Sequence, residues 1–525
     1  MLPRVLRRSA ILLAALLTSA CASAPERRPD NPPPPPPAEA PPPARVDPLA
    51  GIDAYAAETL AAWKAPGLAI AVVRGDETGG EVAFARGYGT RELDGAAPVD
   101  AHTRFPVASL TKTFTAAAVG ALVDEGKFAW DDPLKRHFPG FCVKDPHVAV
   151  ALTLRDVLAH RSGLEDRADL LWIGTGFDRR EVIRHLCQVG QAAPLRTQFS
   201  YSNVLYAVAG EFTARASGLS WEELVKSRLL DPAGMGESGF GAPAPGGENT
   251  ARPHAERDGV LVPIAPRDVT NIGPAAGLVT SAHDLARWLL VLLGRGVIEG
   301  KRVVSAGVVD AMLTPTTMVG LRPWQKELYP ESHFLAHGMG FMLQDYRGRL
   351  VAWATGGIDG YSCSMALLPE EKLGVVVLAN VPFTGLPEGM VFRLLDAHLG
   401  APPKDWSGKR LALSLASRAR AAAARKERVG ERETTAYPVP LERLGGLFAS
   451  PMFGDAVIEN RDGVLRLRFA NAARATLEPW RPGALLARFE DADLEPSFVT
   501  FTMDTRGVVT SFVLGDHGTF KRVTR

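Results

Sequence analysis

The sequence of 525 residues predicts an α+β protein. We expect a mainly antiparallel sheet flanked by helices, with an all-helical subdomain, followed by a small all-β barrel domain. Three observations predict this. Apolar runs typical of strands occur near both ends of one long segment, the stretch between them has mostly helical spacing, and the last part of the chain alternates short strands with turns. Strands at both ends of one domain must close a common sheet, which favours antiparallel pairing over repeated βαβ units.

The strand predictions rest on short apolar runs bounded by turn signals. The first two runs are joined by a glycine-rich turn, and the later three are separated by Gly-Gly and Pro-Glu-Glu-Lys turns. The expected strands cover residues 67–73, 81–87, 350–353, 361–368 and 373–378.

The helical pattern begins at Ser109 and continues to Glu125, where Gly126 suits the position just beyond a helix end. From there to about Leu230 the spacing stays mostly helical, with turn signals between the segments. We therefore expect residues 49–400 to form one domain.

The composition changes after this domain. Residues 401–437 are rich in Ala and Arg, and we expect a linker helix that is solvated over residues 410–428 rather than one that binds lipid or a polymer. Residues 438–525 contain short strands, and the alternation in Leu465-Arg466-Leu467-Arg468-Phe469 is typical of a half-buried strand. This region is expected to form a separate small β-barrel, with a sandwich as the alternative.

The overall composition excludes several classes of protein. A balance of 59 Lys and Arg against 58 Asp and Glu argues against a dedicated nucleic-acid-binding protein, which would carry a basic excess. Four cysteines are too few for a disulfide scaffold of this length, and no Cys-x-x-Cys or Cys-x-x-His pair indicates structural zinc.

Residues 1–20 have the pattern of an export signal. Three arginines precede a short apolar stretch, which is below the roughly 20 apolar residues that a transmembrane helix needs. Residues 17–21 resemble a bacterial lipobox, with Cys21 as the lipidated first residue, although Thr18 stands where Leu is preferred. The alternative is ordinary cleavage within residues 22–24, which would leave Pro25 just past the cut. We expect an exported lipoprotein of the bacterial cell envelope that faces the periplasm and is anchored to the membrane through Cys21.

Residues 21–48 are proline-rich and are expected to act as a tether. Such a segment prefers the extended polyproline II conformation, at about 3.1 Å per residue, and cannot pack a core. If Cys21 carries lipid, three cysteines remain, so at most one disulfide can form. The sequence does not choose the pair among Cys142, Cys187 and Cys363.

Ser109 and Lys112 form the first candidate catalytic pair. Residues three apart share a face of a helix, so the hydroxyl and the amine can meet. A serine hydroxyl needs a base beside it to act as a nucleophile, and a lysine can serve only if its pKa is lowered. Taken alone, the spacing also fits a helix cap at Ser109 and a solvated lysine.

Two further motifs carry candidate groups. Tyr201 and Asn203 form the only Tyr-x-Asn in the chain; the phenol can pass a proton, and the amide can position a lysine and a substrate carbonyl. Thr355-Gly356-Gly357 ends one of the expected strands, where glycines let a ligand lie against the strand edge. Each motif alone also fits a simple turn.

The three motifs together resemble the serine β-lactamase and penicillin-binding-protein superfamily, in which Ser-x-x-Lys, Tyr-x-Asn and a late Thr-Gly occur in this order. The chain is more specifically similar to class C β-lactamase-like serine hydrolases, which include esterases, D-amino-acid peptidases and DD-carboxypeptidases. The resemblance covers roughly residues 53–399 and includes the stretches 158–164, 230–235 and 277–285. The segment after residues 437–440 is similar to the β-barrel appended to some of these hydrolases.

The resemblance implies a β-lactamase/transpeptidase-like fold and an acyl-enzyme route. Ser109 would attack a carbonyl, Lys112 and Tyr201 would move its proton, and Asn203 would position the substrate. Water would then release the acyl group.

The late strand would supply the rest of the site. The backbone N–H groups of Ser109 and Gly357 would hold the oxyanion, and Thr355 and Gly356 would line the same edge. Removing one donor of this kind lowers the rate by about 10²–10³. A small-molecule or peptide substrate is implied, with no cofactor, no metal ion and no nucleic acid.

One departure from the family pattern concerns specificity. The family usually has Lys or His before Thr-Gly, whereas this chain has Ala354. That cation normally supports the tyrosine or meets a substrate carboxylate, so its loss favours neutral esters or amides and predicts weak or no β-lactamase activity, unless an arginine from a loop takes its place.

The other hydrolase signatures are missing, because the chain has neither Gly-x-Ser-x-Gly nor His-Glu-x-x-His. The main alternative is a non-catalytic or weakly catalytic relative that binds cell-wall fragments or β-lactams. The presence of Ala354 in place of the usual Lys or His is the feature that supports this alternative. The sequence leaves the oligomeric state open.

Overall fold

The computed structural model describes residues 47–76, 79–242, 248–257, 259–382, 384–434, 436–469, 473–491 and 494–523. The predicted export signal, Cys21 and nearly all of the proline-rich tether lie outside the described residues.

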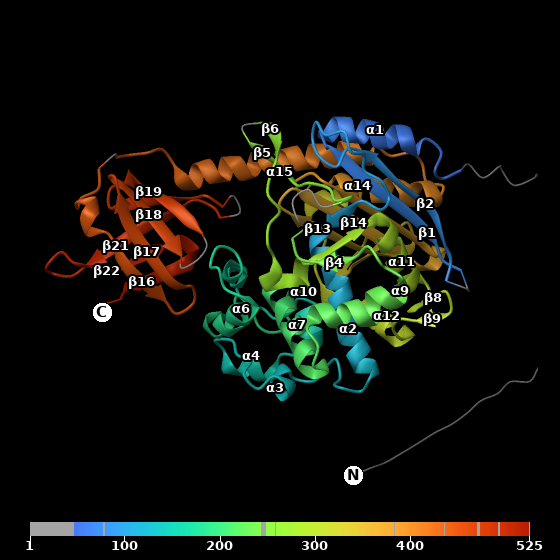
Figure 1. Ribbon diagram of the computed structural model, residues 1–525, viewed down its shortest axis with the longest axis horizontal. Coiled ribbons are helices and arrows are strands. Elements are labelled where there is room, and N and C mark those ends of the chain that lie inside the picture. The colour runs from blue at the N-terminus through green and yellow to red at the C-terminus, as the bar shows by residue number, and fades with distance from the viewer. Residues whose placement is uncertain are drawn as a thin grey trace, which may run out of the picture. The chain divides into compact units, whose positions relative to one another are not determined.

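An eight-stranded antiparallel sheet forms the centre of the first domain (Figure 1). In spatial order its strands are β10 (Thr317–Met318), β11 (Leu335–His337), β12 (Met342–Tyr346), β13 (Arg349–Ile358), β14 (Tyr361–Leu368), β15 (Leu373–Ala379), β1 (Gly67–Arg74) and β2 (Glu81–Gly89). Strand β1 pairs with β15, from Leu68 opposite Ala379 to Arg74 opposite Leu373. The two distant segments therefore close one sheet, as the sequence predicts.

Both faces of this sheet are covered, because alternate residues of β1 enter two different cores. Leu68, Ile70 and Val72 belong to a core shared with α1 (Ile52–Trp63) and α14 (Leu386–His398). Ala69, Ala71 and Val73 enter the main core on the other face, which α11 (Ala282–Leu293) covers. A strand buried on both faces appears in the sequence as a continuous apolar run rather than an alternating one.

The segment between the strands of the sheet forms the expected helical subdomain. Its helices are α2 (Thr111–Asp124), α3 (Leu134–His137), α4 (Pro146–Ala151), α5 (Leu154–Leu158), α6 (Arg179–His185), α7 (Asn203–Ser217), α8 (Trp221–Val225), α9 (Asp231–Ala233) and α10 (Gly273–Ala276). Helix α2 differs from the prediction at its start, because Ser109 lies in a preceding 3₁₀ turn, η1 (Ala108–Leu110).

A small second sheet lies beside these helices. Its order is β3 (Arg104–Pro106), β7 (Leu278–Ser281) and β4 (Gly239–Phe240), and β7 is antiparallel to both neighbours. The remaining elements of this domain are the hairpins β5 (His254–Arg257) with β6 (Val260–Pro263) and β8 (Val297–Ile298) with β9 (Lys301–Arg302), and the helices α12 (Ala306–Met312) and α13 (Pro323–Leu328).

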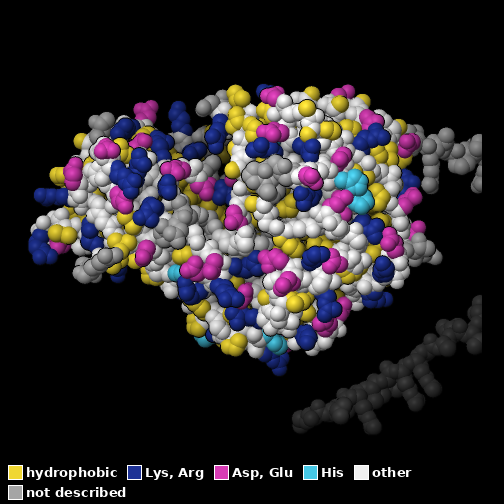
Figure 2. Space-filling view, viewed as in Figure 1, with side chains coloured by type: hydrophobic (Ala, Val, Ile, Leu, Met, Phe, Trp, Pro, Cys, Tyr) yellow, Lys and Arg dark blue, Asp and Glu magenta, His cyan; other side chains and the backbone are white. Residues whose placement is uncertain are grey.

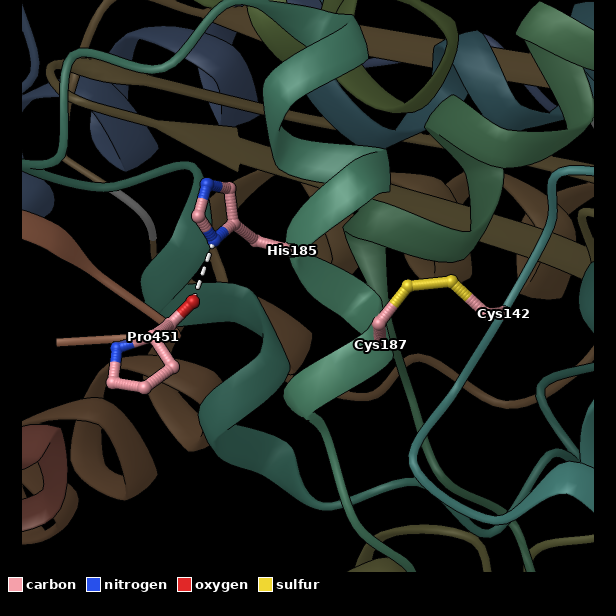
Figure 3. The surroundings of a disulfide bond; sticks show 4 residues. All are labelled: Cys142, His185, Cys187 and Pro451. Atoms are coloured by element: carbon pink, nitrogen blue, oxygen red, sulfur yellow. Dashed lines mark hydrogen bonds between the residues drawn. A yellow bond between two sulfur atoms is a disulfide. The ribbon is translucent and has the colours of Figure 1, made fainter.

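The structure selects one cysteine pair. Cys142 is bonded to Cys187, which lies in the 3₁₀ turn η3 (Leu186–Gln188) directly after α6 (Figure 3). Cys363 is buried as a free thiol. In the same region, the Nδ1 atom of His185 lies 3.0 Å from the backbone oxygen of Pro451 (Figure 3).

Helix α15 (Trp406–Val429) connects this domain to the last one. The structure confirms the predicted solvated helix over residues 411–428, but the first residue of the predicted stretch, Arg410, is buried, as is Trp406 before it. Trp406 is fully buried and donates its indole N–H to Asp396 at 2.8 Å, and Arg410 is only 5% exposed and pairs with Glu388. Beyond its first turns the helix is largely exposed. A buried arginine needs a carboxylate partner, and that partner lies too far away in the sequence for a local pattern to reveal it.

The last domain is a closed eight-stranded barrel. Its strands are β16 (Gly446–Ser450), β17 (Gly454–Arg461), β18 (Val464–Phe469), β19 (Arg474–Arg481), β20 (Ala484–Phe489), β21 (Ser497–Met503), β22 (Val509–Leu514) and β23 (Gly518–Arg522). Leu465, Leu467 and Phe469 are buried while Arg466 is exposed, as the alternation predicts. Closure pairs β16 with β23 and leaves no open sheet edge.

On the face of the molecule shown in Figure 2, lysine and arginine side chains are interspersed with acidic ones. Among the described residues, no helix combines the length and hydropathy that crossing a membrane requires.

Candidate functional site

Ser109 lies in a tight turn that holds it at the junction of β3 and α2. The residue before it, Ala108, has a φ of 43°, in the left-handed region that non-glycine residues seldom adopt. Ala108 and Leu110 on either side are buried. Such strain persists only where the surrounding structure overdetermines it, and it is found most often at functional sites.

The four polar side chains predicted from the motifs meet at this turn. The Ser109 hydroxyl lies 2.7 Å from the Tyr201 hydroxyl and 3.0 Å from the Lys112 Nζ atom. Lys112 also donates to Asn203 Oδ1 at 2.8 Å and to the backbone oxygen of Ala275 at 3.0 Å. Residues separated by 92 positions in the chain are thus in hydrogen-bond contact.

Burial changes the acid–base properties of two of these groups. Lys112 is 3% exposed, and burial lowers its pKa to about 7, although the negative charge of Asp169 acts in the opposite direction. The pKa of Tyr201 is raised, mainly by burial of its hydroxyl, while the residue as a whole stays 41% exposed. Near neutral pH the site therefore combines a protonated phenol with a lysine poised to lose its proton.

Asp169, which the sequence analysis missed, orients the amide of Asn203. Its carboxylate accepts from the side-chain Nδ2 of Asn203 at 2.9 Å and from the backbone N–H groups of Asn203 and Val204 at 3.0 and 3.2 Å, at the start of α7. Because Nδ2 is committed to Asp169, the oxygen of the amide faces Lys112. The pair lies 34 positions apart, and no local pattern links the two residues.

Two buried histidines, His160 and His337, complete the surroundings and were also missed as site residues. The ring of His160 lies 4.4 Å from that of Tyr201 and 4.9 Å from that of His337, centroid to centroid. Burial holds the pKa of His160 well below its ordinary value and lowers that of His337 to about 4, and the charge of Lys112 adds to both shifts. Both rings are therefore neutral near pH 7. His160 lies within the 158–164 stretch, which was the available signal.

The Thr355-Gly356-Gly357 motif lies where one edge of strand β13 has no neighbouring strand among the described residues. Pairing of β13 with β12 ends at Trp353, whereas pairing with β14 continues to Ile358. Residues 354–358 therefore have a ladder partner on one side only within the described residues, and a substrate can lie along the other.

Gly356 allows β13 to come close to the turn that carries Ser109, residues 107–110, which is called the serine turn below. A Cβ at this position would lie 2.3 Å from the backbone oxygen of Val107 and 3.1 Å from the backbone nitrogen of Ser109. A Cβ contact of 2.3 Å with a backbone oxygen is far below the spacing that real structures show, so glycine lets β13 come this close to the turn.

Ala354 is 6% exposed in β13 and offers no charge. A loop arginine, Arg267, does reach the neighbouring hairpin, but its guanidinium is engaged by two carboxylates. It donates to Asp359 at 2.9 Å and to both oxygens of Asp491, a residue of the barrel domain, at 2.9 and 2.7 Å.

A large open cavity of about 2330 Å³ adjoins the site. It is lined by Gly357, Ile358 and Asp359 of the hairpin, by residues of the helical subdomain, and by barrel residues that include Arg474 and Asp491. Ser109 itself is not among the lining residues. Among the residues of the three motifs, Gly357 alone lines the cavity, so the cavity meets the candidate site at the strand edge.

Comparison with known proteins shows to which of them the chain is similar in sequence and fold. Residues 52–398 match the family model described as Beta-lactamase. The unguisins hydrolase ungD of Aspergillus violaceofuscus is 28% identical over 381 residues, which cover 67% of this chain and 65% of the relative. Penicillin-binding protein 4 of Amycolatopsis lactamdurans is 29% identical over 284 residues, covering 53% and 72%. This chain thus spans just under two thirds of the length of the first of these relatives.

A similar fold occurs in the octameric penicillin-binding protein homologue from Pyrococcus abyssi. The two structures share 21% sequence identity with a TM-score of 0.58, over 90% of this chain and 99% of the other. The family match covers more than half of the chain. This protein belongs to the beta-lactamase family.

Proposed function

We propose that this protein is a serine hydrolase that cleaves an ester or amide through an acyl-enzyme formed on Ser109. One observation carries the proposal: the Ser109 hydroxyl is in hydrogen-bond contact with both the buried Lys112 and the Tyr201 hydroxyl. A serine used only as a helix cap has no need of a desolvated amine or a phenol.

Lys112 is the group best suited to act as the base. In its neutral form the amine donates two hydrogen bonds, to Asn203 and to the backbone oxygen of Ala275, and its lone pair accepts the hydrogen of Ser109. A base with a pKa near the working pH is the most effective in proton transfer. The raised pKa of Tyr201 keeps its proton available for transfer to a leaving group.

The steps follow from these positions. The Ser109 oxygen attacks the carbonyl carbon and its proton passes to Lys112, while the carbonyl becomes an oxyanion facing backbone N–H groups. When the tetrahedral intermediate collapses, the bond to the leaving group breaks. The leaving oxygen or nitrogen takes the proton of Tyr201, which Lys112 restores. Water then attacks the ester on Ser109, with the proton moving in reverse, and the acid product leaves.

The substrate that the site favours is a neutral ester or amide. Ala354 leaves the strand without the cation that would meet a carboxylate, and Arg267 is engaged by Asp359 and Asp491. The open edge of β13 suits an extended acyl group, including a peptide. Cell-wall-related peptides without a free carboxylate at the cleaved end are one such class.

The test is covalent labelling and turnover of the purified protein. We expect a fluorophosphonate probe to label the wild type and p-nitrophenyl esters to be hydrolysed, while Ser109→Ala loses both and Ser227→Ala, at an exposed serine, keeps both. Nitrocefin should be turned over weakly or not at all. A folded wild type that neither labels nor hydrolyses any ester or D-aminoacyl amide would favour the alternative of a non-catalytic binding protein. Labelling that persists in Ser109→Ala would place the nucleophile elsewhere.

We further propose that the protein is exported and anchored through lipid on Cys21. The Cys142–Cys187 disulfide supports export, because disulfides persist in oxidising compartments such as the periplasm. Metabolic labelling with an alkyne fatty acid should mark the full chain and spare Cys21→Ala. Equal labelling of the two would contradict the anchor.

A further inference from the structure

A histidine and carboxylate cluster lies away from the candidate active site. His102, Glu237 and His283 each offer one ligand atom, and these atoms all lie within 4.8 Å of one another. The three residues come from separate segments: His102 precedes β3, Glu237 precedes β4, and His283 is in the first turn of α11.

The topology of the small sheet explains why they meet. Strand β7 is antiparallel to both β3 and β4, with Arg104 opposite Ser281 and Gly239 opposite Val279. The start of β3, the start of β4 and the end of β7 therefore fall at one end of the sheet. Ser109 follows the opposite end of β3, so the cluster is separated from the candidate active site by the length of that strand.

The side chains are held in place around a single carboxylate. Glu237 lies 2.5 Å from the Nδ1 atom of His102 through one oxygen, and its other oxygen accepts from the Ser281 hydroxyl. The two imidazole rings lie 4.7 Å apart, centroid to centroid. Both rings therefore face the same acidic group.

One atom in the cluster is not accounted for by hydrogen bonding. The Nδ1 atom of His283 is buried and makes no hydrogen bond with any described residue, yet it lies 3.4 Å from an oxygen of Asp284 and 4.0 Å from one of Glu237. With metal bonds of about 2.0–2.1 Å, two ligands of a tetrahedral zinc ion are separated by roughly 3.4 Å. The 3.4 Å between this atom and Asp284 equals the spacing of two ligands that share one ion, and the 4.0 Å to Glu237 is about 0.6 Å wider.

We propose that His102, Glu237 and His283 bind a divalent transition metal ion, with Zn²⁺ as the best match, and that Asp284 or water fills the fourth position. Two imidazoles and a carboxylate form a donor set typical of zinc, whereas Mg²⁺ and Ca²⁺ prefer oxygen ligands alone.

Binding of the ion requires a small movement of one ligand. If His102 moved away from Glu237 by less than about 1 Å, the two ligand atoms would reach the tetrahedral spacing. The side chain of His102 can make this movement because it is 55% exposed. The ion would tie three chain segments together, so its role is structural. The sequence analysis expected no metal because it looked only for cysteine spacings and for motifs of neighbouring residues. His102, Glu237 and His283 are too far apart in the chain to form such a motif.

The test is zinc binding by the untagged protein, stripped of metal and titrated with zinc. We expect the wild type to bind about one zinc per chain. His102→Ala and His283→Ala should each bind zinc more weakly. The loss of affinity should exceed the roughly 10–100-fold seen when a residue that only supports a ligand is removed. The matched control is His333→Ala. It removes an exposed histidine that also pairs with a carboxylate, that of Asp345 at 2.6 Å, but that does not belong to the proposed site.

A second measurement guards against a folding defect. His102→Ala removes a largely exposed side chain, and its circular dichroism should match that of the wild type. Cobalt should give the wild type the intense visible bands of a four-coordinate site, which His102→Ala should lose. Zinc should raise the melting temperature of the wild type and of His333→Ala, but not that of His102→Ala. A wild type that binds no zinc, or a folded His102→Ala that binds zinc and cobalt as the wild type does, would overturn the proposal.

Discussion

The burial of Lys112 predicts how the rate of hydrolysis depends on pH. Lys112 must be neutral to accept the proton of Ser109, and its pKa is lowered from an ordinary value of 10.5 to about 7 by burial. Activity is therefore gained as the pH rises through about 7 and is lost as the pH falls below it. Because kcat/KM reports the free enzyme, its acidic limb should have this pKa.

The magnitude follows from the fraction of neutral amine. With a pKa of about 7, roughly 10% of the lysine is neutral at pH 6 and about 90% at pH 8, so kcat/KM should rise about tenfold over this range and then level off. A lysine with its ordinary pKa would instead give a rise of about 100-fold between pH 6 and pH 8, continuing at about tenfold per unit up to pH 10.

The assay is hydrolysis of a p-nitrophenyl ester under subsaturating conditions, followed at the isosbestic wavelength of the product. Lys112→Arg should be inactive at every pH, because a guanidinium stays charged in this range. The same substitution at the exposed Lys127 should leave the profile unchanged. A profile that keeps rising beyond pH 9, or an active Lys112→Arg with the profile of the wild type, would refute the assignment of Lys112 as the base.

Three further predictions concern residues that hold the site and the fold in place. Asp169→Asn should shift the acidic limb to lower pH, because the carboxylate raises the pKa of the lysine, and should lower kcat/KM at pH 8 by roughly tenfold or more, since displacement of a catalytic group by ~1 Å can cost about 10² in rate. Gly356→Ala should lower kcat by a similar factor of about 10², because its Cβ would lie 2.3 Å from a backbone oxygen of the serine turn. Replacing Cys142 and Cys187 together by Ser should lower the free energy of unfolding by about 4 kcal/mol, the chain-entropy value for a loop of 45 residues.

Each of these has its own control. The pH profile of Asp169→Asn is compared with that of Asp145→Asn, which alters the cap of helix α4. An acidic limb that stays at the wild-type pH in Asp169→Asn would show that Asp169 does not act on the lysine. Gly307→Ala, at an open helix position, should keep full activity, and equal activity in Gly356→Ala would contradict the close approach of β13. Thermal unfolding with and without reductant checks the disulfide, and an unchanged midpoint in the double serine variant would remove its role in stability.

The accuracy of the predictions depended on how local their physical causes are. The strands β1, β14 and β15 were predicted within a residue or two, since an apolar run between turn residues expresses burial directly. The alternation in β18 predicted which side chains face the barrel interior. By contrast, the buried start of α15 was missed, because a run of Ala and Arg resembles a solvated helix unless the partner Glu388 is known.

In the candidate site, too, some residues could be found from local sequence and others only from the tertiary structure. The sequence by itself identified Ser109, Lys112, Tyr201 and Asn203, because each stands in a short motif whose residue types carry recognisable chemistry. Only the tertiary structure placed Asp169 behind Asn203, paired Cys142 with Cys187 and brought His102 and His283 to one carboxylate. Motifs and hydrophobic periodicity are properties of neighbouring residues, whereas these contacts join positions far apart in the chain and arise only when the packing of the sheets and helices brings those positions together.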